Sequence, residues 1–186
     1  MKRLVFCVNL LSHNKSSAID NVVRLIVKSV IFTLLFVSIG LNTNAQIVFE
    51  FSSKLAAMKA SGNLTAVNEA AHINSLVTDM QPTVYVSDVV NASGVSLPVR
   101  ADVKAGAVSN LSIANPLFAQ VELITIRINS QADLSTTIDL SSIQGFTNLK
   151  YVRLLCSFNC TAVQLGAIVT GNNTGIVVFY SISIPS

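Results

Sequence analysis

Two cysteines are the residues whose spacing points most directly to chemistry. Cys156 and Cys160 are separated by three residues, and a cysteine pair in an exported chain favours a disulfide. If both cysteines lay in one extended strand, their Cα atoms would be about 13 Å apart, whereas a bridge needs less than about 7 Å. We therefore predict a Cys156–Cys160 disulfide in which the strand ends by Cys156 and residues 157–159 turn. Two unrelated buried thiols are the alternative, and the spacing does not match the Cys-x-x-Cys redox motif.

The exported part of the chain contains few residues that could support histidine-dependent chemistry. His72 is the only histidine after residue 45, and zinc sites combine three or four His, Cys or carboxylate ligands. A nucleophilic triad would have to use His72 with Ser75 or Asp79 on the same helix, and no G-x-S-x-G elbow accompanies them. We therefore predict no catalytic triad, no metal ligand and no cofactor.

Paired carboxylates are the remaining catalytic option. Glycoside hydrolysis uses two acids that face one cleft, about 5–10 Å apart. Each acid after residue 45, taken singly, is explained as a helix, turn or surface residue: Glu50, Glu69, Asp79, Asp88, Asp102, Glu122, Asp133 and Asp139. A small secreted hydrolase that uses two of them is the alternative to a non-catalytic protein.

The beginning of the chain has the features of an export signal. Arg24 and Lys28 precede an apolar run at residues 29–41, which is shorter than the roughly 20 residues of a comfortable membrane span. Small residues then precede a cleavage position between Ala45 and Gln46. We predict a cleaved signal with a long N-terminal region, and a retained membrane anchor is the alternative.

This leader divides the chain into residues 1–45 and a single exported domain at 46–186, which we expect to be secreted or periplasmic in a bacterium. The leader carries five cations and one acid, a net of +4 in a chain of net +3, so residues 46–186 have a net charge of −1. Nucleic-acid binders need a stripe of Lys and Arg, but the cations of this domain are scattered singly along the sequence. We expect no nucleic-acid partner and, after cleavage, no membrane partner.

The exported domain is predicted to contain helices followed by strands. Capping residues and apolar stripes indicate helices at 54–60 and 63–80. Runs of β-branched and apolar residues predict strands at 83–90, 97–105, 108–114, 121–129, 149–156, 163–170 and 176–184. Turn residues predict two hairpins, one joining 83–90 to 97–105 and one spanning 163–184. The order indicates an α+β fold, with an N-terminal helical segment followed by a mainly β domain; a β-sandwich is the alternative.

One segment contains an internal spacing of 28 residues. Two sets of residues fit the template L-x-x-L-x-L-x-x-N, the second with Ser in place of Asn: Val121, Ile124, Ile126 and Asn129, then Leu149, Val152, Leu154 and Ser157. Residues 121–157 resemble a leucine-rich repeat. The resemblance implies a short solenoid with adjacent, parallel strands and a protein-binding surface on the strand face.

These observations predict a non-catalytic binding or structural module outside the cytoplasm. The expected partner is a protein or a surface polymer. A leucine-rich-repeat-like fragment that binds protein is a more specific form of this hypothesis, and the carboxylate hydrolase is the competing one.

Overall fold

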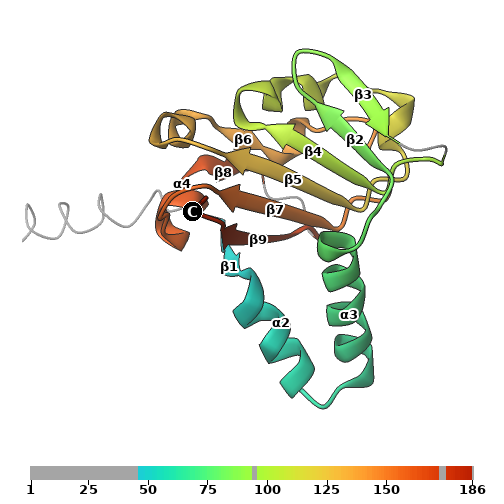
Figure 1. Cartoon of the computed structure of the whole chain (residues 1–186), viewed down its shortest axis with the longest axis vertical. Coiled ribbons are helices and arrows are strands. Elements are labelled where there is room, and N and C mark those ends of the chain that lie inside the picture. The colour runs from blue at the N-terminus through green and yellow to red at the C-terminus, as the bar shows by residue number, and fades with distance from the viewer. Residues whose placement is uncertain (1–45, 94–95, 172–174, 186) are drawn as a thin grey trace, which may run out of the picture. The chain divides into compact units, whose positions relative to one another are not determined.

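A seven-stranded sheet forms the centre of the fold (Figure 1). The computed structural model describes residues 46–93, 96–171 and 175–185. The strands of the sheet lie in the order β1-β9-β7-β5-β4-β2-β3, and all neighbours are parallel except β2 and β3. Their bounds are β1 (Phe49–Glu50), β2 (Thr83–Val86), β3 (Val90–Ser93), β4 (Arg100–Lys104), β5 (Leu123–Ile128), β7 (Tyr151–Cys156) and β9 (Val177–Ile182).

The strands β2, β4, β5, β7 and β9 lie in the sheet in the same order as in the chain. Parallel neighbours need a crossover connection, so the chain has to return between strands. The connections contain η1 (Ala105–Ser112) and η2 (Pro116–Phe118) after β4, η3 (Gln131–Ser135), β6 (Ile138–Asp139) and η4 (Leu140–Ser142) after β5, and α4 (Ala162–Ile168) and β8 (Val169–Thr170) after β7. β6 and β8 also pair in parallel. The chain from β4 to β9 therefore winds through coils that stack on one another.

The main core lies between the sheet and these connections. Alternate strand residues enter it from one side and apolar residues of the connections from the other. The strands contribute Val84, Val103, Ile124, Ile126, Val152, Leu154 and Val178, and the connections contribute Leu111, Phe118, Ile138, Leu140, Leu165 and Val169. Burial of one such side chain stabilises by roughly 1.5–3 kcal/mol, so this packing holds each strand to the connection that follows it.

A helical hairpin follows β1 and precedes β2. It consists of α2 (Phe51–Ala60) and α3 (Leu64–Thr78). Gly62, between the two helices, has a φ of 68°, a conformation that glycine adopts at no steric cost. Leu55 of α2 and Ile73 of α3 form a second apolar cluster with Leu123 and Phe179 of the sheet. These strand residues point away from the main core, so the hairpin covers part of the second face of the sheet.

The α+β class and the helical segment at the start of the domain are confirmed. Asn63 caps α3, since its side chain accepts hydrogen bonds from the backbone N–H groups of Thr65 and Ala66. The start of α2 differs from the prediction. Glu50 is its capping residue, and the carboxylate accepts hydrogen bonds from Ser52 N and Ser53 N at 3.1 Å and 2.6 Å.

The hairpin predicted at 163–184 is wrong. The first half of this segment forms α4, because Thr161 and Gln164 make a capping box that satisfies the first N–H groups of a helix. β9, the second half, pairs in parallel with β7 on one side and β1 on the other. The segment is therefore a crossover between parallel strands.

The hairpin predicted between 83–90 and 97–105 is also wrong, although both segments contribute strands. β4 pairs with β2 in parallel, and the antiparallel partner of β2 is β3. β3 consists largely of the residues expected to form the turn. The strand predicted at 108–114 is mostly the 3-10 helix η1, whose buried Ala107 and Leu111 explain the apolar character of the segment.

The strands at 121–129 and 149–156 are adjacent and parallel. Ile124 lies opposite Val152 and Ile126 lies opposite Leu154, which is the 28-residue offset found in the sequence. Beyond the strand ends, Ser157 N donates to the carbonyl oxygen of Ile128 at 3.0 Å. Strand residues that occupy the same position of the sequence template therefore lie opposite each other in the sheet.

Candidate functional site

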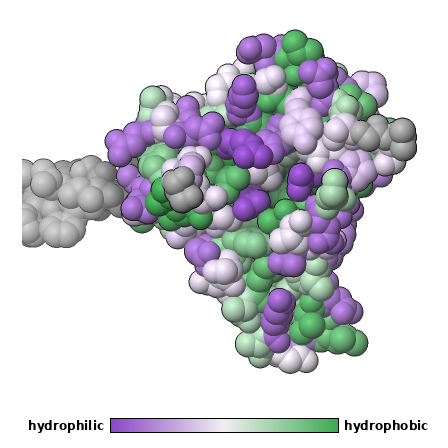
Figure 2. Space-filling view, viewed as in Figure 1, coloured by the Kyte–Doolittle hydropathy of each residue, from purple (hydrophilic) through white to green (hydrophobic). Residues whose placement is uncertain are grey.

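The second face of the sheet is only partly covered by the helical hairpin, and its uncovered part is the candidate site. The register of β2, β4, β5 and β7 places seven side chains there, which we call the open face: Tyr85, Asp102, Lys104, Thr125, Arg127, Arg153 and Leu155. Tyr85 is 46% exposed, and the Arg127 side chain is 47% exposed. In the space-filling view, hydrophilic side chains form a band over the strands with hydrophobic side chains between them, and both hydrophilic and hydrophobic side chains cover the helical hairpin (Figure 2).

Asp102 and Arg127 form the central ion pair of the open face. Two nitrogens of the guanidinium, Nε and Nη2, donate to the two carboxylate oxygens, each at 2.6 Å. The hydrogen bond to Asp102 raises the pKa of Arg127. Asp102 is buried, and a buried carboxylate needs such a partner. The pair therefore fixes the direction of Arg127 on the face.

Arg153 lies between the sheet and the start of α2. Its Nε donates to Ser181 Oγ at 3.1 Å, and its guanidinium lies 5.7 Å from the ring centroid of Phe51. Burial lowers the pKa of Arg153, and the positive charges of Arg100 and Arg127 lower it further. Its two Nη nitrogens have no hydrogen-bond partner among the described residues. Arg153 thus presents free donors in a positively charged setting.

A cavity of about 420 Å³ lies at the carboxyl ends of the strands. Lys104 belongs both to the open face and to the lining of this cavity. Ser87, Asp88, Asn129 and Asp133 contribute polar groups to its wall. Because Lys104 makes no ion pair with any described residue, its ammonium group is available at the boundary between the face and the cavity.

The histidine considered for a triad is used in a different contact. His72 Nε2 lies 3.0 Å from Glu122 Oε2, and Lys150 Nζ lies 2.9 Å from the same oxygen. Burial raises the pKa of Glu122, but hydrogen bonds from His72 and Lys150 outweigh it and leave the pKa below its usual value. Ser75 donates to Asp79 at 2.7 Å. The serine and the histidine therefore belong to separate contacts, and the contact of His72 joins α3 to the start of β5.

Seven of the eight acids considered for a hydrolase have partners within the fold. Side chains of three accept hydrogen bonds at helix starts, namely Glu50, Asp133 and Asp139. Four others accept from side chains: Glu69 from Tyr151, Asp79 from Ser75, Asp102 from Arg127 and Glu122 from Lys150. Burial, together with Glu69, raises the pKa of Tyr151 to about 12. Among the described residues, no three His, Cys, Asp or Glu side chains are grouped to hold a metal ion.

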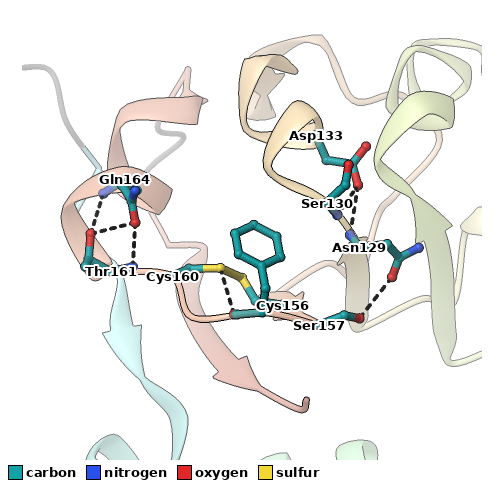
Figure 3. Close-up of a disulfide and its surroundings, with 9 residues drawn as sticks. Asn129, Ser130, Asp133, Cys156, Ser157, Cys160, Thr161 and Gln164 are labelled. Carbon is teal, nitrogen blue, oxygen red and sulfur yellow. Dashed lines mark hydrogen bonds between the residues drawn. A yellow bond between two sulfur atoms is a disulfide. The ribbon is translucent and has the colours of Figure 1, made fainter. Parts of the chain in front are cut away.

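Cys156 and Cys160 form a disulfide directly after β7 (Figure 3). Their Cα atoms are 6.7 Å apart, and β7 ends at Cys156, as the spacing of the cysteines requires. The turn between the cysteines carries Phe158, which packs against the main core. The bridge therefore sits where the chain leaves the sheet and enters the connection that contains α4.

The predicted leader falls outside the described residues, as does Ala45 of the predicted cleavage position. Gln46, the predicted first residue after cleavage, begins the described part of the chain. Within that part, no helix is long and apolar enough to span a membrane.

Comparisons with protein-family models, with curated proteins and with solved structures find no match for this chain. Its function is therefore inferred from the geometry of the open face.

Sequence reasoning did not find the open face. Its cations come from three strands and are separated in the chain by more than 20 residues wherever the strand changes. The 28-residue offset that aligns β5 with β7 is visible in the sequence. It places Arg127 opposite Leu155, however, and Arg153 opposite Thr125, so it does not by itself show that the two arginines are neighbours. Only the full register of β4, β5 and β7 shows that these side chains are neighbours.

Proposed function

We propose that this chain is an exported binding module that holds another protein on the open face of its sheet. The observation that carries the proposal is the partial cover of this face. The helical hairpin packs on Leu123 and Phe179, and it leaves Tyr85, Arg127 and Lys104 exposed. Arg and Tyr are among the residue types that contribute most at protein interfaces.

The stacked coils support a solenoid of the leucine-rich-repeat type. Strand positions that face each other in the sheet recur after 23, 28 and 26 residues, at Arg100, Leu123, Tyr151 and Val177. Leucine-rich repeats have periods of about 20–29 residues, and about three are needed to bury a continuous core. In such a fold the strand face is the part that is left free for a partner.

Export is the second part of the proposal. The leader-like residues 1–45 support it, and so does the Cys156–Cys160 bridge, since disulfides persist in oxidising compartments. The N-terminal sequence of the protein recovered outside the cytoplasm tests this part directly. A start at Gln46 is the expected result, whereas recovery of the intact chain only from the cytoplasm would contradict it.

Site-specific photocrosslinking in the cells that make the protein tests the binding surface. A benzophenone amino acid in place of Tyr85 should yield a discrete crosslinked species of higher mass on irradiation. The same replacement at Val163, which is 80% exposed on α4, serves as the control and should yield none. Equal crosslinking at both positions, or none at Tyr85, would reject the open face as a protein-binding surface.

A further inference from the structure

The open face concentrates positive charge in a domain that has a slightly negative net charge. Residues 46–186 contain seven Lys and Arg residues. Three of these lie on the open face: Lys104 of β4, Arg127 of β5 and Arg153 of β7. A fourth, Arg100 of β4, lies on the same side of the sheet but donates to the carbonyl oxygens of Leu76 and Val77 in α3. One acid, Asp102, lies among them. A partner that covers this face therefore meets an excess of positive charge.

Several donors on this face are unused within the described part of the chain. Asp102 engages Nε and Nη2 of Arg127 but not Nη1. Arg153 uses only Nε, toward Ser181, and Lys104 has no partner. The lowered pKa of Arg153, caused by burial and then by Arg100 and Arg127, is consistent with a site where an added anion would be favourable.

These unused donors indicate the chemistry of the partner. Resting on the proposed binding module, we infer that the segment held on the open face is an acidic peptide stretch of a partner protein, whose carboxylates pair with Arg153, Arg127 and Lys104. Planar guanidinium groups bind carboxylates through paired hydrogen bonds. The positive electrostatic potential of these side chains would also increase the rate at which an acidic partner associates.

The apolar members of the open face favour a peptide over other polyanions. Tyr85 and Leu155 flank the cations, and a peptide supplies both carboxylates and apolar side chains to match them. Sugar-binding platforms rely on aromatic faces, and this chain has no tryptophan. Nucleic-acid binders need a stripe of Lys and Arg that follows the phosphates, whereas the open face carries three cations interrupted by Tyr85 and Leu155.

Titration with labelled decapeptides tests the inference. The first peptide has Asp and Glu alternating with Ser, Leu and Tyr, and its matched counterpart has Asn and Gln in place of the acids. We expect the exported, disulfide-bonded protein to bind the acidic peptide, and to bind its amide counterpart at least tenfold more weakly. Hydrogen bonds to charged groups predict a loss of roughly tenfold to a hundredfold in affinity for Arg153→Gln. Lys104→Gln should weaken binding less, and Lys59→Gln, at an exposed position on α2, should have no effect.

Salt dependence gives a second measurement that does not require a variant to fold. Affinity of the wild-type protein for the acidic peptide should fall as NaCl is raised from 50 mM to 500 mM, because salt screens exposed charges.

Equal binding of the acidic peptide and its amide counterpart would overturn the inference. So would binding of oligogalacturonate, heparin or an oligonucleotide without binding of the acidic peptide, or binding of none of these probes. Crosslinking at Tyr85 that persists in those cases would retain the binding surface and reject only its acidic partner, whereas loss of crosslinking rejects the surface itself.

Discussion

The hydroxyl of Ser157 donates a hydrogen bond to the side-chain oxygen of Asn129, at 3.2 Å and across 28 positions of the chain. Each residue directly follows the end of its strand, and the two strands are neighbours in the sheet. The contact therefore links successive coils at the carboxyl ends of their strands.

Loss of this contact should destabilise the fold modestly. We expect Asn129→Ala and Ser157→Ala each to lower the free energy of unfolding by about 0.5–1.5 kcal/mol. The loss in the double variant should be smaller than the sum of the two single losses, because both substitutions remove the same contact. Ser183→Ala is the matched control, because Ser183 follows β9 in the same way and its hydroxyl has no partner among the described residues. Urea denaturation of the wild-type protein and of these four variants gives the free energies of unfolding. Strict additivity would show that the two side chains do not interact.

Separating Asp102 from Arg127 should cost more than breaking a surface ion pair. Arg127→Met leaves a buried carboxylate without its partner, for which we expect a loss of about 2–3 kcal/mol. The double variant Asp102→Asn/Arg127→Met should recover part of this loss, because the buried charge is gone. Lys150→Met breaks the pair with Glu122, in which the lysine side chain is 56% exposed, and should cost less than about 1 kcal/mol. Thermal unfolding of the variants at one pH gives the comparison, and equal losses would contradict the assignment of Asp102 as buried.

Glu50 should make the start of α2 sensitive to acid. Hydrogen bonds from Ser53 and Ser52 lower the pKa of Glu50 from 4.5 to about 2 in the folded protein. A carboxyl whose pKa is lowered on folding stabilises the protein above its unfolded pKa, and this stabilisation is lost as the pH falls through the folded pKa. Glu50→Gln should therefore cost about 1 kcal/mol at pH 7. The difference from wild type should shrink between about pH 4.5 and pH 2, and unfolding curves across this range measure it. A difference that does not vary with pH would show that the charge of Glu50 plays no part in capping.

The Cys156–Cys160 bridge should contribute moderately to stability, because the loop it closes is short. The loop-entropy estimate is about 2 kcal/mol, which is the loss expected for the Cys156→Ala/Cys160→Ala variant. The intact protein should weigh two hydrogen atoms less than its reduced form. Agreement of the native and reduced masses would show that the thiols are free.

Gly171 should tolerate no side chain. Its φ is 67°, and an added Cβ would overlap Asp139 Oδ1 and lie 2.7 Å from Ser141 N. Asp139 caps η4 through this region, so we expect Gly171→Ala to cost at least about 2 kcal/mol through strain and a disturbed cap. Gly106→Ala is the control, since an added Cβ there meets nothing within 4 Å. Similar unfolding midpoints for the two variants would contradict the close packing at Gly171.

The parts of the fold that can be predicted from sequence depend on strong local signals. The β-branched run at 121–129 and the template shared with 149–156 locate β5 and β7, and the reach of a disulfide locates the end of β7 at Cys156. These signals extend over a few residues or repeat at a fixed offset, so they can be recognised in the sequence without knowledge of the fold.

The errors arise where two local signals compete. Residues 163–170 are apolar enough for a strand, and a glycine-rich turn comes after them, so the pattern predicts a hairpin. The capping pair Thr161 and Gln164 is visible in the sequence and would have indicated a helix. The open face requires more than local signals, because Asp102, Arg127 and Arg153 become neighbours only through the register of three strands.

The pairing of β1 with β9 has a consequence for the order in which the protein folds. Phe49 lies opposite Phe179, so the first strand of the described domain finds its neighbour only after nearly the whole domain has left the ribosome. The helices that come after β1 also depend on late residues, because they pack on Tyr151 and Phe179. Contacts between such distant parts of a chain slow folding. We therefore expect the coils from β4 to β9 to assemble first, and the N-terminal helices to dock on them as the last step.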